Sequence, residues 1–111
     1  MKKTIKLIAL VVLFAIVVSL LSCAYLSHKG TAAFEAVKMG DSQAQVIAAF
    51  GIPYVAKPAG VAFPRYAAPG CQTPCTERLW FPNIMSMDIE AWSVDFDKQD
   101  HAIDKYHWSS P

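Results

Sequence analysis

The sequence lacks a net positive charge outside its first residues. The 111 residues carry a formal charge of +1, but Lys2, Lys3 and Lys6 account for three of the ten basic residues. Without residues 1–22, which hold no acidic residue, seven basic residues stand against nine acidic ones. A clustered basic surface is the electrostatic mark of a nucleic-acid-binding protein. The sequence therefore predicts no nucleic-acid partner.

Catalytic motifs are absent as well. The chain has no G-x-S-x-G, no H-E-x-x-H and no glycine-rich phosphate-binding loop. His101 and His107 lie on one predicted strand, about 20 Å apart by strand rise, which is too far for one metal ion. Asp95 and Asp97 share a strand face, where we interpret them as solubilising groups on an exposed edge. We therefore predict a protein that is not an enzyme and has no cofactor or metal.

What the sequence does have is an apolar run behind the N-terminal lysines. Leu7 to Leu21 is fifteen residues long, the length of a signal-peptide core and shorter than the ~20 residues of a membrane-spanning helix. The run ends in Leu20-Leu21-Ser22-Cys23, which resembles the lipobox of bacterial lipoproteins. We therefore predict a signal peptide over residues 1–22 and lipidation of Cys23. An uncleaved signal anchor is the alternative.

The residue after the predicted lipidation site bears on localisation. By the sorting rule of enterobacterial lipoproteins, Asp at this position retains the protein in the inner membrane, and here the residue is Ala24. The resemblance implies a protein lipid-anchored in the outer membrane and facing the periplasm. Residues 23–30 are then a short polar tether, and residues 31–111 form the domain.

The strongest local signal lies between Ser42 and Gly51. Ser42 and Gln45 have the spacing of a capping box at a helix start. Gly51 stands where a left-handed residue ends a helix. Val46 and Phe50 lie four residues apart and share one face. This stretch predicts a short amphipathic helix.

A second short helix is predicted over residues 31–38, with Thr31 as its cap. Two turns of helix are marginal alone in water, so we expect this helix to pack on the apolar face of the following one. Met39 and Gly40 break the chain between them. The pattern predicts a helical hairpin.

Prolines dominate residues 52–74. They recur every five or six residues, which excludes a helix and an interior strand. Val61–Phe63 and Arg65–Tyr66 leave room for a short edge strand only. We predict a surface loop that is functional or tied down, because it is longer than most connections. The prolines are Pro53, Pro58, Pro64, Pro69 and Pro74.

Two cysteines remain once Cys23 is lipidated. In an oxidising compartment, Cys71 and Cys75 are expected to form a disulfide that closes a five-residue loop. The alternative is a redox-active or metal-binding thiol pair, with Met85 and Met87 as further soft ligands for copper.

The C-terminal third alternates apolar and polar residues in the manner of β-strands. Three runs separated by turn residues predict a three-stranded antiparallel meander: Glu77–Phe81, Ser86–Phe96 and Ala102–Trp108. Tyr106 and Trp108 share one face of the last strand, and Lys105 and His107 share the other. We expect the aromatic face of the meander to cover the helical hairpin in an α+β domain of two layers.

Aromatic side chains are numerous in this part. Because a small domain buries a limited core, some of them are candidates for an exposed partner-binding surface. The alternative is that all of them belong to the core. The four candidate partner-binding residues are Trp80, Trp92, Tyr106 and Trp108.

Two stretches resemble one known family. Gly40-x-Ser42-x-x-Gln45-Val46, followed by Phe50-Gly51-x-Pro53, resembles the signature of the SmpA/OmlA (BamE-like) outer-membrane lipoproteins. Trp92-Ser93-Val94-Asp95-Phe96-Asp97 is similar to the last hairpin of that family. The family's hairpin glycine is missing, and we expect Asp100 in the left-handed position instead. The chain is thus identified as a divergent member.

The resemblance implies a non-enzymatic lipoprotein that binds envelope proteins and supports outer-membrane assembly or integrity. Its expected partners are the membrane, through the lipid anchor, and the assembly proteins of outer-membrane β-barrels. Two other functions stay open. One is a periplasmic metal or redox binder that uses Cys71 and Cys75, and the other is an inhibitor-like binding module.

Overall fold

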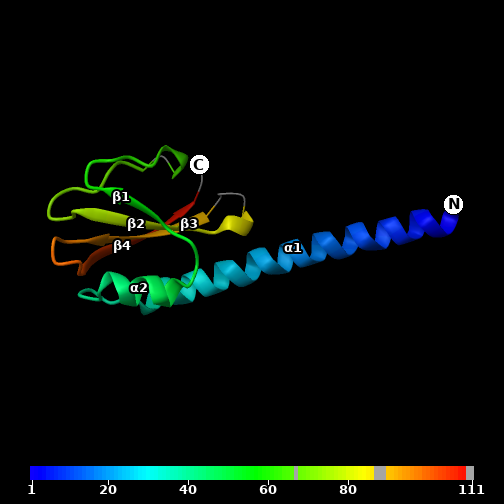
Figure 1. Cartoon of the computed structure of the whole chain (residues 1–111), viewed down its shortest axis with the longest axis horizontal. Coiled ribbons are helices and arrows are strands. Elements are labelled where there is room, and N and C mark those ends of the chain that lie inside the picture. The colour runs from blue at the N-terminus through cyan, green and yellow to red at the C-terminus, as the bar shows by residue number, and fades with distance from the viewer. Residues whose placement is uncertain (67, 87–89, 110–111) are drawn as a thin grey trace.

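A computed structural model describes residues 1–66, 68–86 and 90–109. Within them the strands form one antiparallel sheet in the order β1-β2-β3-β4, and both helices lie on one face of it (Figure 1). The predicted α+β class is confirmed, with one strand more than expected. The elements are α1 (Lys2–Ala36), α2 (Gln43–Phe50), β1 (Val55–Pro58), β2 (Glu77–Pro82), β3 (Glu90–Phe96) and β4 (Ala102–Ser109), with short 3-10 turns η1 (Pro64–Tyr66) and η2 (Ile84–Ser86).

The first helix is longer than the sequence predicted. Residues 23–30, expected as a short polar tether, are helical, and the separate helix expected over residues 31–38 is the end of α1. No proline interrupts residues 2–36, and their many Leu, Ala and Lys residues favour a helix. Gly30 is buried where α1 meets the sheet, and a Cβ atom there would overlap the indole ring of Trp92. We had assigned Gly30 to the tether, whereas it lets the helix approach β3.

The second helix confirms the capping prediction. The Ser42 hydroxyl accepts a hydrogen bond from the Gln45 backbone N–H, and the Gln45 side chain accepts one from the Ser42 N–H at 2.8 Å. Gly51 ends the helix with a φ of 60°, in the left-handed region. Val46 and Phe50 are buried against the sheet. The two helices pack side by side as the predicted hairpin, with α1 far longer than its partner (Figure 1).

The proline-rich segment contributes the strand that the prediction missed. β1 pairs with β2 at the sheet edge, from Val55 opposite Trp80 to Pro58 opposite Glu77. Its side chains are mostly exposed, so it has no apolar alternation to identify it. The edge strand predicted over residues 61–66 is wrong, because this stretch forms the turn η1 and a single bridge between Phe63 and Ala68.

The last two strands form the predicted hairpin, and Asp100 has a φ of 59°, in the expected left-handed region. β3 is described from Glu90 onward, and residues 87–89 of the predicted strand lie outside the described residues. The expected orientation of β4 is wrong. Trp92 is paired with His107, and cross-strand partners point to the same face, so His107 lies on the helix side. Tyr106 and Trp108 therefore point away from the helices.

The sheet is covered on both faces. The helix face carries an apolar core, and the other face packs on residues of the proline-rich segment. β3, expected to be half-buried, is buried on both sides as a result. The helix-face core comprises Ala33, Val37, Val46, Phe50, Leu79, Phe81, Trp92, Val94, Phe96 and Ala102, and the loop-face cluster comprises Tyr66, Ala68, Trp80 and Ala91.

Candidate functional site

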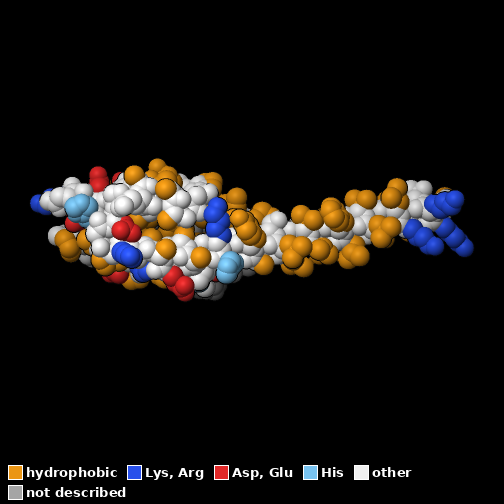
Figure 2. Space-filling model, turned by 90° about the horizontal axis from the view of Figure 1, so that it is seen from below, with side chains coloured by type: hydrophobic (Ala, Val, Ile, Leu, Met, Phe, Trp, Pro, Cys, Tyr) orange, Lys and Arg blue, Asp and Glu red, His pale blue; other side chains and the backbone are white. Residues whose placement is uncertain are grey.

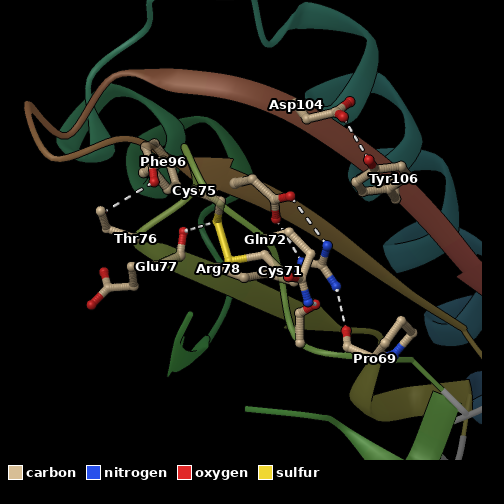
Figure 3. The surroundings of a disulfide bond; sticks show 12 residues. Pro69, Cys71, Gln72, Cys75, Thr76, Glu77, Arg78, Phe96, Asp104 and Tyr106 are labelled. Atoms are coloured by element: carbon tan, nitrogen blue, oxygen red, sulfur yellow. Dashed lines mark hydrogen bonds and ion pairs between the residues drawn. A yellow bond between two sulfur atoms is a disulfide. The ribbon is translucent and has the colours of Figure 1, made fainter. Parts of the chain in front are cut away.

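The two predicted disulfide cysteines lie together where the proline-rich segment enters β2. Cys71 and Cys75 are joined by a disulfide, with their Cα atoms 5.9 Å apart (Figure 3). Both are buried. The next residue, Thr76, donates its backbone N–H to the Phe96 carbonyl at 2.8 Å. The disulfide therefore holds the loop at the position where β2 begins to pair with β3, as expected.

Beside the disulfide lies a buried ion pair that the sequence did not reveal. Arg78 Nε donates to one carboxylate oxygen of Asp95 at 2.6 Å, and Arg78 Nη2 donates to the other at 3.1 Å. The third guanidinium nitrogen donates to the Pro69 carbonyl at 3.1 Å (Figure 3). Asp95, interpreted above as an exposed solubilising group, is 5% exposed. That interpretation was wrong because Pro69 and the disulfide loop lie against this part of the sheet.

Aromatic rings complete the surroundings of Arg78. The guanidinium carbon lies 5.6 Å from the ring of Trp80, 5.4 Å from Tyr106 and 5.7 Å from Trp108. Arg guanidinium groups are attracted to the faces of such rings. The Tyr106 hydroxyl donates to Asp104, and this hydrogen bond, together with burial, raises the pKa of Tyr106. The phenol is therefore neutral at physiological pH.

A groove of about 440 Å³ runs between the disulfide loop and β4. Its buried charged groups are already engaged, since Arg78 uses all three nitrogens and Asp95 both oxygens. The sulfur atoms of Cys71 and Cys75 lie within 4.8 Å of an Asp95 oxygen and of each other. They could ligate a metal only after the disulfide is reduced and Arg78 releases Asp95.

Met85, one of the two methionines proposed as further copper ligands, does not join this cluster. Met85 lies in η2, which follows the far end of β2 from the disulfide. Met87 lies outside the described residues. The geometry of the described residues thus favours a structural role for Cys71 and Cys75.

The four aromatic residues proposed to bind a partner do not form one surface. Trp80 is 1% exposed and Trp92 is 0% exposed, on opposite faces of the sheet, so the proposal of accessible rings is wrong for these two. Trp108 is half-buried against Trp80, and its indole N–H donates to Ser93 at 2.7 Å. Of the four, Tyr106 alone is exposed, at 39%. The three tryptophan rings are buried or half-buried because both faces of the sheet are covered.

Cys23, the predicted lipidation site, lies within α1 at the junction with the domain. It is a half-buried free cysteine whose carbonyl accepts a hydrogen bond from the Asn83 side chain at 3.5 Å. The same Asn83 side chain donates to Glu90 at 3.1 Å, and the hydroxyl of Ser27 donates to Glu90 at 3.2 Å. Glu90 therefore ties α1 to the sheet through Ser27, about one helical turn after Cys23.

The Glu90 carboxylate is also 2.9 Å from the ring nitrogen Nε2 of His107. Burial raises the pKa of Glu90, but the hydrogen bonds from Asn83, His107 and Ser27 outweigh burial, so its pKa is lowered overall. Glu90 and its partners lie up to 63 residues apart in the sequence, so no local sequence pattern predicts these contacts.

Beyond this junction, α1 projects into the open with its apolar side chains uncovered (Figure 2). Its most apolar 18-residue window has a mean hydropathy of 3.0, and none of it is buried. By length and composition the helix could cross a membrane, and a signal sequence has the same properties. No protein-family model, curated protein or solved structure matches the chain. The resemblance to SmpA/OmlA lipoproteins stays a prediction.

Proposed function

We propose that this chain is a non-enzymatic lipoprotein of the bacterial outer membrane whose α+β domain binds other envelope proteins at the periplasmic surface. One observation carries the proposal: an uncovered apolar helix runs without a break into the domain and is fastened there. Leaving such a helix in water costs about 25 cal/mol for each Å² of apolar surface. A membrane, or removal of the segment by processing, relieves that cost.

The contacts of α1 are compatible with lipidation at Cys23. Among the described residues, the hydrogen bonds between α1 and the rest of the domain involve Cys23 or residues after it. Lys105 donates to the Phe34 and Val37 carbonyls at the end of α1 at 2.6 and 3.0 Å. Cleavage before Cys23 therefore leaves helical residues 23–36 held to the sheet by these bonds.

The binding role rests on the resemblance and on the state of the polar groups. Arg78 and Asp95 satisfy one another, and the neighbouring thiols are joined. Charged groups and thiols that are already bonded to one another are not available for proton transfer or metal binding. Their pairing therefore supports a binding scaffold better than a catalytic or metal site. The proposed partners are outer-membrane β-barrel assembly proteins, and the proposed outcome is support of outer-membrane assembly or integrity.

Crosslinking in intact cells tests the proposal. The full chain with a C-terminal tag is crosslinked, purified and its partners identified by mass spectrometry, with a Cys23→Ser variant as the matched control. We expect envelope assembly proteins in near-stoichiometric amount with the wild-type chain and their loss with the variant. Recovery of the chain without a protein partner would overturn the binding role. An intact mass that still begins near Met1 would overturn lipidation.

Thiol titration separates this proposal from the metal or redox alternative. Under native conditions, the lipidated protein should expose no reactive thiol, because Cys23 is acylated and Cys71 is joined to Cys75. Two reactive thiols would instead favour a metal or redox binder.

A further inference from the structure

The turn η2 presents apolar side chains to solvent at the junction between α1 and the domain. Ile84 is 57% exposed and Met85 is 38% exposed. They adjoin apolar residues of α1 around a shallow depression of about 550 Å³. We call this surface the junction patch, and its members are Val18, Leu21, Tyr25, Leu26, Ile84 and Met85.

The turn is held so that its polar groups face inward. The Asn83 side chain accepts a hydrogen bond from the Met85 N–H at 3.1 Å. The Ser86 hydroxyl donates to the Asn83 carbonyl at 2.8 Å and accepts from the Glu90 N–H at 3.2 Å. Unpaired polar groups are costly in an apolar medium. The Met85 and Ser86 N–H groups and the Ser86 hydroxyl bond within the turn, so they keep their hydrogen bonds when the tip of η2 leaves water.

We infer that the junction patch is a second membrane contact, in which Ile84 and Met85 insert into the interface between lipid headgroups and acyl chains. This inference rests on the proposed membrane anchoring. The reason for a lipid occupant is continuity, because the patch extends the uncovered apolar surface of α1 onto the domain. Tyr25, 64% exposed, adds an aromatic ring with a polar tip, a residue type enriched at membrane interfaces.

The inference holds for either mode of anchoring. If Cys23 carries acyl chains, Val18 and Leu21 have been removed with the signal peptide. The acyl chains then supply the neighbouring apolar surface, because the Cys23 carbonyl bonds to Asn83, the residue before η2. If α1 is retained, its apolar stretch enters the bilayer and brings Val18 and Leu21 alongside η2. The membrane then fixes the orientation of the domain, with η2 toward the lipid and the β3–β4 turn away from it (Figure 1).

The test uses a tryptophan reporter in the full chain, extracted from membranes and reconstituted into phosphatidylcholine vesicles with brominated acyl chains. Ile84→Trp places the reporter in η2. Met39→Trp is the matched control, because Met39 has nearly the same exposure, 54%, and precedes Gly40, which bonds to Ala102 at the start of β4. The emission of the three native tryptophans is measured on the unsubstituted chain and subtracted.

At an interfacial depth of roughly 5–10 Å, we expect the Ile84→Trp emission to fall by about half relative to unbrominated vesicles. The control emission should not change. If the chain binds the vesicles but neither reporter is quenched, the inference is overturned while the proposed membrane anchoring is retained. A second copy found covering η2 by crosslinking would also overturn the inference. A chain that does not float with the vesicles removes the proposed anchoring itself.

Discussion

The two faces of the sheet are covered by different means. On the helix face, Phe50 stacks on Phe81 with ring centroids 4.1 Å apart, and α1 approaches Trp92 through Gly30. On the loop face, an ion pair and a disulfide lie among the aromatic rings. A helix satisfies its own backbone groups, whereas an irregular loop brings unpaired carbonyls such as that of Pro69. The loop face therefore needs a buried donor, and Arg78 supplies it.

The largest expected effect tests that dependence on charge. Arg78→Met leaves Asp95 buried without a partner, which typically costs about 3–5 kcal/mol of the free energy of unfolding. The double variant Arg78→Met with Asp95→Leu should lose less than half as much, because no uncompensated charge remains. Urea denaturation of the three proteins measures both values. A single variant that costs less than about 1 kcal/mol would show that the ion pair does not organise this face.

The second prediction tests the dependence of the helix face on shape. Gly30→Ala adds a methyl group against the fully buried ring of Trp92. Overpacking costs about 1–3 kcal/mol, and the better helix propensity of Ala returns at most about 1 kcal/mol. We expect a net loss, measured by urea denaturation, that Trp92→Phe in the same chain partly relieves. Strictly additive losses in the two substitutions would contradict the close approach of helix and sheet.

The smallest expected effect lies at the seam where α1 meets β3 and β4. The folded state lowers the pKa of Glu90, so its contribution to stability is fully present above the unfolded value near 4.5. It is lost as the pH falls through the lower folded value. The stability advantage of the wild type over Glu90→Gln should thus shrink below pH 4.5. It is expected to be about 1 kcal/mol or less, as measured by urea denaturation from pH 7 to pH 3. An advantage that grows with acidity would contradict this.

Sequence patterns predicted the features that depend on neighbouring residues. The capping box of Ser42 and Gln45, the left-handed residues Gly51 and Asp100, and the disulfide between Cys71 and Cys75 are all found as expected. Each joins residues at most four positions apart, so a short stretch of sequence contains all the information. The α+β class followed in the same way from the periods of the helical and strand segments.

Features that join distant residues were missed. β1 has no alternation because it lies at an exposed edge, and Asp95 was placed at the surface because nothing in its neighbourhood predicts Arg78. The orientation of β4 depends on its register with β3, which contains an irregularity between Asp95 and Phe96. A shift of one residue exchanges the two faces of a strand. The proposed aromatic surface failed because both faces of the sheet are covered, which buries Trp80 and Trp92.

By itself, then, the sequence determined the apolar N-terminal segment, the candidate lipidation site at Cys23, the capped helix α2, the disulfide and the three C-terminal strands. Only the tertiary structure decided that α1 continues into the domain and that Gly30 admits Trp92. It also decided that Arg78 neutralises Asp95 and that Ile84 and Met85 lie beside the apolar helix. The physical reason is the range of the interactions. Capping, periodicity and short-loop crosslinks act within a few residues, whereas packing and charge pairing act between residues that only the folded chain brings together.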